Sequence, residues 1–231
     1  VPAAVSLTAT DNCAGEITTS GVDTIAAGQC PNSFVITRTW TFTDACNNSS
    51  AVSQIITVND TIAPTFVEAL PTDSTVQCDA VPTAATLTAT DNCGEANVTF
   101  EEAIAQGSCP GAYTITRTWT ATDACNNVTA HIQTITVQDT TVPVITTQAS
   151  SIVVECDGSG NQGAVQAWLA SNGGAVATDN CSDVTWSNDF DALSNDCSAA
   201  ITVIFTATDA CGNTASSSAT FTVQDITAPI T

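Results

Sequence analysis

A pair of cysteine motifs occurs three times and organises the whole chain. The first motif reads Asp-Asn-Cys and the second reads Thr-Asp-Ala-Cys. Their cysteines are Cys13 and Cys46, then Cys93 and Cys125, then Cys181 and Cys211. The second motif recurs after 79 residues, from Cys46 to Cys125, and after 86 residues, from Cys125 to Cys211. Internal repetition at this length indicates a tandem array of small domains.

The repeat predicts where the domains begin and end. We expect a first repeat over residues 1–60, a second over 61–139 and a third over 140–225, with 226–231 beginning a linker to a further repeat. Val1-Pro2-Ala3 aligns with Val81-Pro82-Thr83, so the first repeat is expected to lack its N-terminal strand and the chain to be a fragment of a longer protein.

The eleven cysteines are expected to act as disulfide staples. A domain of roughly 80 residues buries little apolar surface, and disulfides are the usual supplement in an oxidising compartment. Zinc sites favour closely spaced Cys-x-x-Cys pairs, which this sequence lacks. We therefore predict an extracellular or cell-surface location.

The charge of the chain limits its partners. Only Arg38 and Arg117 are basic, against 23 acidic residues, and the formal net charge is −21. Nucleic acid and anionic membranes would repel such a chain, whereas divalent cations would be attracted to it. No apolar run is long enough for direct membrane insertion of this segment.

Alternating residues predict β-strands joined by Asn-, Asp- and Gly-containing turns. In the second repeat the expected strands are 74–78, 84–90, 97–103, 113–122 and 129–137. Several short strands of this kind predict an all-β fold: three immunoglobulin-like antiparallel β-sandwich domains in tandem, stapled by disulfides.

Two local features are expected to be structural. Arg117 shares a strand face with Trp119, and we expect it to form an ion pair near a sheet edge, with Glu101 or Glu102. Residues 164–170 have helical spacing and precede Asn172-Gly173-Gly174, a good stop signal. We expect a short helix in the third repeat that caps the open edge of its sandwich.

The disulfide pairing is predicted from sandwich topology. Strand 84–90 and strand 113–122 end at the same pole, which brings their cysteines together, and the other two cysteines of a repeat lie at the opposite pole. The expected pairs are Cys93–Cys125, Cys78–Cys109, Cys181–Cys211, Cys156–Cys197 and Cys13–Cys46. Cys30 remains unpaired in this segment. Four cysteines allow three connectivities, so the other two pairings stay open.

The same topology suggests a calcium site where each linker meets the following repeat. Asp60 would approach Asp91, Asn92 and Asp123. The equivalent residues at the next junction are Asp139, Asp179, Asn180 and Asp209. Carboxylates and carbonyls are the ligands that calcium prefers. The structural alternative is that these aspartates form Asx turns and caps at strand ends.

Several of these motifs together resemble a known family. Val-x-Cys, Ala-Thr-Asp-Asn-Cys, Arg-Thr-Trp-Thr, Thr-Asp-Ala-Cys and Val-Gln-Asp-Thr-x-x-Pro are similar to the hyalin-type (HYR-like) immunoglobulin repeats of long Bacteroidetes surface proteins. The resemblance covers essentially the whole chain and implies a filamentous surface or secreted protein, exported by type IX secretion. Thr24, Thr61, Ser74 and Thr140 each follow aspartate and resemble the O-glycosylation signal of Bacteroidetes envelopes.

Function is expected to be structural or adhesive, with partners that are neighbouring copies of the chain or surface glycans. The alternative is a carbohydrate-binding or spacer array of a secreted enzyme, for which Trp168 and Trp186 are the candidate sugar platforms. An enzyme is not expected. His131 is the only histidine, it has no counterpart in the other repeats, and no nucleophile–base set can be assembled around it.

Overall fold

The computed structural model describes residues 1–228, of which 50% lie in β-strands and 5% in helices. Pro229, which ends the predicted linker motif, and residues 230–231 lie outside the described residues. Among the residues described, no helix is long and apolar enough to span a membrane. The predicted all-β, disulfide-stapled fold with one short helix is confirmed.

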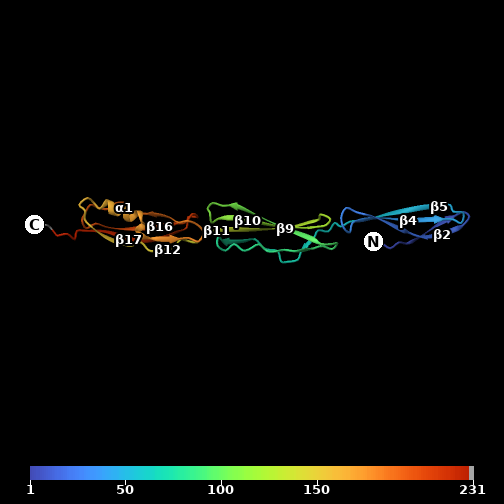
Figure 1. Ribbon diagram of the computed structural model, residues 1–231, viewed down its shortest axis with the longest axis horizontal. Helices are drawn as coiled ribbons and strands as arrows, with labels where there is room; N and C mark the ends of the chain where they lie inside the picture. The colour runs from blue at the N-terminus through green and yellow to red at the C-terminus, as the bar shows by residue number, and fades with distance from the viewer. Residues whose placement is uncertain (229–231) are drawn as a thin grey trace. The chain divides into compact units, whose positions relative to one another are not determined.

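The first repeat contains a hairpin and a three-stranded sheet. The hairpin pairs β1 (Ser6–Asp11) with β2 (Gly15–Ser20). The antiparallel sheet has the order β3 (Val22–Ala27), β4 (Phe34–Thr43) and β5 (Ser49–Val58). β4 and β5 run side by side over their whole lengths (Figure 1).

The second repeat contains a two-stranded and a four-stranded sheet. The small sheet pairs β6 (Thr65–Phe66) with β8 (Ala89–Thr90). The larger sheet consists of β7 (Ser74–Gln77), β11 (Val128–Gln138), β10 (Tyr113–Asp123) and β9 (Ala96–Gln106), in that order. β7 runs parallel to β11.

The strand predicted over 84–90 is wrong for most of its length, because only the last two residues pair, in β8. The preceding stretch makes different contacts. The indole Nε1 of Trp119 donates to the carbonyl oxygen of Ala85 at 3.0 Å. A side chain from β10 therefore occupies an acceptor that a partner strand would otherwise use.

The third repeat has the same plan with a helix added. β12 (Val144–Thr147) pairs with β14 (Val176–Thr178). The larger sheet has the order β13 (Ile152–Glu155), β17 (Thr214–Gln224), β16 (Ala200–Thr208) and β15 (Thr185–Asn188), with β13 parallel to β17. Helix α1 (Gln162–Ala170) and a 3-10 turn (Asn172–Gly174) lie between β13 and β14.

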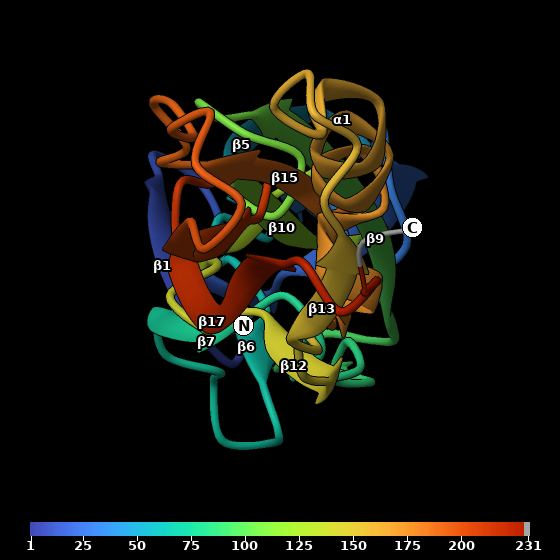
Figure 2. The same cartoon turned by 90° about the vertical axis from the view of Figure 1, so that its left-hand side faces the viewer.

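Helix α1 contributes to the core of the third repeat. Its Trp168 is 6% exposed and meets Phe205 edge-on, with ring centroids 5.1 Å apart. Phe205 alternates along β16 with Val203 and Ala207, and all three are fully buried. Figure 2 shows α1 from a second side, with β13, β15 and β17 of the same repeat labelled. Trp168 is thus a core residue, and Trp186 also packs against this core.

An arginine sits on the buried face of the first two large sheets. In β4 the Nε of Arg38 lies 2.7 Å from a carboxylate oxygen of Asp23 on β3. Arg38 also donates to the carbonyl oxygen of Pro2 at 2.9 Å, so this buried guanidinium is paired. Arg117 is buried at the same position of β10, and Val203 replaces it in β16.

The chain folds as two compact units whose boundary does not follow the repeats. One unit comprises Val1–Pro71, Ala85–Glu101 and Arg117–Ile132. The other comprises Thr72–Ala84, Glu102–Thr116 and the chain from Gln133 onward. The second repeat therefore contributes residues to both units, and β9, β10 and β11 each have residues in both.

Candidate functional site

Each Thr-Asp-Ala-Cys motif folds into a tight turn organised by its aspartate. The Asp209 carboxylate accepts hydrogen bonds from the backbone N–H groups of Cys211 and Asn213, both at 2.8 Å, and from the Asn213 side-chain amide at 2.8 Å. Asp123 makes the same three bonds with Cys125 and Asn127. These are the Asx turns expected as the structural alternative.

These hydrogen bonds hold both carboxylates in their ionised form. Burial favours the neutral acid, but the bonds from the Asn213 side chain and backbone outweigh it and keep the pKa of Asp209 below its usual value. The pKa of Asp123 is lowered in the same way through Asn127. The residue inside the turn has a positive φ, of 66° at Asn126 and 89° at Gly212, which favours asparagine and glycine.

In the second and third turns the asparagine also anchors the incoming linker. The side-chain amide of Asn127 donates to the backbone carbonyl of Asp60 at 3.3 Å. That of Asn213 donates to the carbonyl of Asp139 at 3.2 Å. These asparagines are not among the site residues predicted from the sequence. The available signal was their recurrence two residues after each motif cysteine, at Asn48, Asn127 and Asn213.

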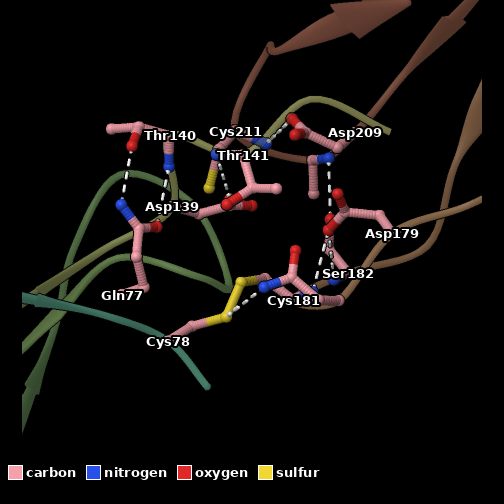
Figure 3. Close-up of a disulfide and its surroundings, with 12 residues drawn as sticks. Gln77, Cys78, Asp139, Thr140, Thr141, Asp179, Cys181, Ser182, Asp209 and Cys211 are labelled. Atoms are coloured by element: carbon pink, nitrogen blue, oxygen red, sulfur yellow. Dashed lines mark hydrogen bonds between the residues drawn. A yellow bond between two sulfur atoms is a disulfide. The ribbon is translucent and has the colours of Figure 1, made fainter. Parts of the chain in front are cut away.

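The anchored linker brings two carboxylates together at each junction. At one, ligand atoms of Asp139, Asp179 and Cys181 lie within 4.8 Å of one another (Figure 3). At the other, Asp60, Asp91 and Cys93 form the equivalent group. We call these groups the second and the first acidic cluster, respectively.

Buried carboxylate oxygens in these clusters have no hydrogen-bond partner. They are Oδ2 of Asp139, Oδ1 of Asp179 and Oδ1 of Asp91. Asp139 as a whole is only 7% exposed. Burial, followed by repulsion from Asp179 and Asp209, raises its pKa above the ordinary aspartate value. Unpartnered buried oxygens of this kind are costly to a fold and suit a hard cation.

The predicted ligand set is only partly assembled. Asp60 with Asp91, and Asp139 with Asp179, are brought together. Asp123 and Asp209 are committed to their own turns. The amides of Asn92 and Asn180 are directed at sulfur, with Nδ2 lying 2.9 Å from Sγ of Cys93 and 3.9 Å from Sγ of Cys78, respectively. Each cluster therefore offers two carboxylates instead of the three expected.

The disulfide pairing predicted from topology is wrong for four of its five pairs, because Cys93–Cys125, Cys78–Cys109, Cys181–Cys211 and Cys13–Cys46 do not form. The structure joins Cys30 to Cys125, Cys78 to Cys181 and Cys109 to Cys211. Their Cα–Cα distances are 5.0, 5.9 and 5.2 Å, within the normal disulfide range. Each bridge joins one repeat to the next and lies inside one compact unit. Cys156–Cys197, inside the third repeat, is the pair that was predicted.

The pairs differ because cysteines of the neighbouring repeat approach the same turns, and the poles of a single sandwich do not include them. Cys78, for example, directly follows β7, and β7 pairs with the end of β11. Since β11 leads into the linker that Asn213 anchors, Cys78 lies near the third repeat, where it is bonded to Cys181. Cys13, Cys46 and Cys93 are free thiols, so the pairs Cys13–Cys46 and Cys93–Cys125 do not form, and Cys30 is bonded.

The glycosylation candidates differ in accessibility. Thr24, Thr61 and Thr140 are exposed, although Thr140 Oγ1 accepts a hydrogen bond from Gln77 at 2.7 Å. The hydroxyl of Ser74 is buried on β7. A glycan on Ser74 would require this strand to open.

His131 has a structural environment. Its Nε2 lies 2.8 Å from the carbonyl oxygen of Pro71, and its ring is 5.9 Å from that of Trp119. These contacts place the histidine against the core of the second repeat.

The family is established by sequence. The model of the HYR-like domain with four cysteines matches residues 1–58 and 66–137. This chain therefore belongs to the family of HYR-like domains with four cysteines. A search of curated protein sequences finds no match to the chain.

Solved structures similar to the chain are extracellular cadherin segments. Drosophila N-cadherin EC1-4 is 13% identical with a TM-score of 0.30, over 94% of this chain and 63% of that one. Mouse Cadherin-23 EC22-24 is 12% identical with a TM-score of 0.29, over 84% and 75%. Protocadherin gammaB7 EC3-6 is 16% identical with a TM-score of 0.32, over 96% and 66%. TM-scores this low do not establish a common arrangement.

The raised pKa of Asp139 predicts a pH-dependent stability in chelator. An acid whose pKa is higher in the folded than in the unfolded state destabilises the fold when it is ionised. Replacing Asp139 with Asn should therefore raise the melting temperature at pH 7 by a few degrees. The difference from wild type should shrink as the pH falls toward the ordinary aspartate pKa of about 3.9, because Asp139 becomes protonated in the folded state first.

Asp225 provides the matched control. It occupies the same linker position and accepts the same local bond, from the Thr227 N–H at 3.1 Å, but it is exposed. Asp225→Asn should leave the melting temperature nearly unchanged at both pH values. Equal effects of the two substitutions would show that Asp139 is not under electrostatic strain.

Proposed function

We propose that this chain is a structural and adhesive segment of a long extracellular surface protein, in which disulfides staple each repeat to the next. The observation that carries the proposal is the set of three bridges between repeats, which span 95, 103 and 102 residues. A tandem array whose repeats are bonded in this way is suited to carrying tension along a stalk or filament.

Chain connectivity defines how such a segment would bear load. Tension applied at the N-terminal end follows the chain to Cys30 and crosses to Cys125. It then runs back to Cys109 and crosses to Cys211. Residues 31–108 and 126–210 are bypassed by covalent bonds. The greater part of the chain can therefore unfold without lengthening the stalk.

The bridges are also expected to stabilise the fold. In the chain-entropy account, a disulfide that closes a loop of about 100 residues lowers the conformational entropy of the unfolded chain. This raises the free energy of unfolding by roughly 4–5 kcal/mol. A small core alone rarely supplies more than about 3–5 kcal/mol. One such disulfide is thus expected to contribute about as much to the free energy of unfolding as the whole core of a repeat without disulfides.

Location follows from the same chemistry. Disulfides persist in oxidising compartments, which supports an extracellular or cell-surface position. The resemblance to Bacteroidetes surface repeats supports export by type IX secretion and assembly of neighbouring copies into filaments. The alternative function, a spacer within a secreted enzyme, would be served by the same array of disulfide-linked repeats. Sugar binding through Trp168 or Trp186 is disfavoured, because both rings pack in or against the core.

We further propose that calcium occupies the two acidic clusters. Asp60 with Asp91, and Asp139 with Asp179, would supply carboxylate oxygens. The unpartnered buried oxygens support this assignment. A bound cation would offset the repulsion between the paired carboxylates and so stabilise the stapled junctions. Extracellular modules bind calcium with dissociation constants of roughly 10⁻⁴–10⁻³ M.

Calcium should therefore raise the melting temperature of the chain relative to chelator, with saturation in the millimolar range. Asp139→Asn should lose part of this rise because one of two clusters is disabled, and adding Asp60→Asn should remove the rest. Asp225→Asn serves as the control and should respond like wild type. The calcium proposal fails if the double variant keeps the full rise.

Single-molecule stretching tests the stapled stalk itself. In the oxidised state the unfolded chain should extend only by residues 1–30, 109–125 and 211–231, at up to about 3.6 Å per residue. Adding reductant should release the remaining residues. Extension of residues 126–155 without reductant would contradict the proposal, because bridges confined within repeats would leave that segment on the load path.

Two cysteine double variants sharpen this measurement. Cys156→Ser with Cys197→Ser removes a bridge that lies off the load path, so the oxidised extension should not change. Cys109→Ser with Cys211→Ser should lengthen it, because tension must then run forward from Cys125 to Cys156 before it crosses to Cys197.

A further inference from the structure

Asp79 lies beside the second acidic cluster, although it is not among the site residues predicted from the sequence. Asp79 and Asp179 line one hollow of about 480 Å³, together with Thr141 and Asn180. The hollow lies within one compact unit, at the junction of the second and third repeats. It has room for a cation and for several coordinating waters, because a water molecule takes up about 30 Å³ in the liquid.

The carboxylate of Asp139 is the buried part of this site. Asp139 is 7% exposed, and its Oδ2 has no hydrogen-bond partner. Gly111 packs directly on it, since a Cβ atom on Gly111 would lie 2.7 Å from Cβ and 3.2 Å from Oδ2 of Asp139. Burial is the main cause of the raised pKa of Asp139, and the charge of Asp79 adds to it. A fixed and unpartnered carboxylate therefore lies within electrostatic reach of Asp79.

The Cys78–Cys181 disulfide fixes the positions of two other carboxylates. Asp79 is the residue after Cys78, and Asp179 lies two residues before Cys181. Oδ2 of Asp179 accepts the N–H of Cys181 at 2.8 Å, which leaves its buried Oδ1 without a partner. Figure 3 shows Asp139 and Asp179 beside the bridge, and their ligand atoms lie within 4.8 Å of each other. The bridge thus holds Asp79 and Asp179 at one hollow.

The third repeat shows a different use of an aspartate in this position. Asp157 also follows a bonded cysteine, Cys156. Its carboxylate accepts backbone N–H groups of Ser159 at 2.7 Å and Asn161 at 3.0 Å, so it closes a local turn. Among the described residues, the carboxylate of Asp79 accepts no hydrogen bond, and its side chain is exposed. Asp79 can therefore rotate toward a cation without breaking a turn.

We propose that Asp79 supplies a third carboxylate to the calcium site of the second acidic cluster, and that the Cys78–Cys181 disulfide sets the calcium affinity of this site. The inference rests on the calcium binding proposed above. Calcium takes roughly six to eight oxygen ligands, so three carboxylates leave places for neutral oxygens and water. Affinity in such sites depends on the number of charged ligands and on the rigidity of the site. The disulfide serves both by holding Asp79 and Asp179 together.

The coupling between cation and disulfide acts in both directions. If closing the disulfide raises the affinity for calcium, calcium must favour the closed disulfide by the same factor. Calcium would then protect this covalent link between the second and third repeats against reduction.

Calorimetric calcium titration of the full chain tests the role of Asp79. All variants carry Asp60→Asn, which disables the first acidic cluster, so that the measured binding reports on the second. Adding Asp79→Asn should weaken calcium binding about tenfold, because a charged ligand is lost. Asp183→Asn is the matched control, since Asp183 is exposed and lies two residues after Cys181 but does not line the hollow. The control should change the affinity by less than about twofold, as expected for a solvent-screened charge.

The disulfide is tested in the same background by Cys78→Ser with Cys181→Ser. The two repeats stay joined by Cys109–Cys211, and the calcium affinity should fall by about tenfold because the site loses rigidity. Cys156→Ser with Cys197→Ser removes a bridge inside the third repeat and should leave the affinity unchanged.

The reverse coupling is measured in a glutathione buffer. Two glutathione thiols reduce the bridge to two cysteine thiols and become glutathione disulfide. At a glutathione ratio that leaves Cys78–Cys181 partly open in chelator, saturating calcium should close it, while Cys156–Cys197 should not respond. Alkylation of the free thiols followed by mass spectrometry gives the open fraction of each bridge.

Melting in chelator separates a ligand from a structural residue. Asp79→Asn removes a charge from an acidic site, so the melting temperature in chelator should not fall, whereas loss of a structural contact would lower it. Unchanged calcium affinity in Asp79→Asn, or in Cys78→Ser with Cys181→Ser, would overturn this inference and leave the calcium proposal standing. No calcium binding by the Asp60→Asn parent would instead refute calcium at the second cluster, and this inference with it.

Discussion

The hydrogen bond from the turn asparagine to the linker carbonyl fixes the arrangement of each junction. Asn127 holds the carbonyl of Asp60, and Asn213 holds that of Asp139. The same asparagines cap the aspartate that closes their own turn, so one side chain ties linker and turn together. Because the motif cysteine lies two residues earlier, its sulfur is fixed beside the end of the preceding repeat.

Bringing the linker to the turn has an electrostatic cost. Asp139 is buried beside Asp179 and Asp209, and a chain with a net charge of −21 offers few cations of its own to balance them. The disulfides hold the carboxylates together regardless of their repulsion, since a covalent bridge does not depend on the charge state of its neighbours. A divalent cation bound there, as we propose, would offset this repulsion.

Much of this arrangement could be predicted from the sequence, because the fold repeats its local signals. Alternation in β10 and β16 identified the buried face, and the asparagine–glycine stop located the end of α1. The pairing of cysteines could not be derived in that way. It depends on how the loop containing Cys30 or Cys109 meets the following repeat, and reasoning about one sandwich at a time does not include that contact. The approach of Asp60 to Asp91 was expected from the sequence, and the turn that Asp123 forms with Asn127 was expected as the alternative to a metal ligand.

The most direct measurement is a disulfide map of the oxidised protein. Free thiols are blocked with N-ethylmaleimide, the chain is digested with pepsin in acid to prevent exchange, and linked peptides are identified by mass spectrometry. The account predicts Cys30–Cys125, Cys78–Cys181, Cys109–Cys211 and Cys156–Cys197, with Cys13, Cys46 and Cys93 alkylated. Finding Cys93–Cys125 and Cys181–Cys211 instead would show that each repeat is closed on itself and would contradict the stapled array.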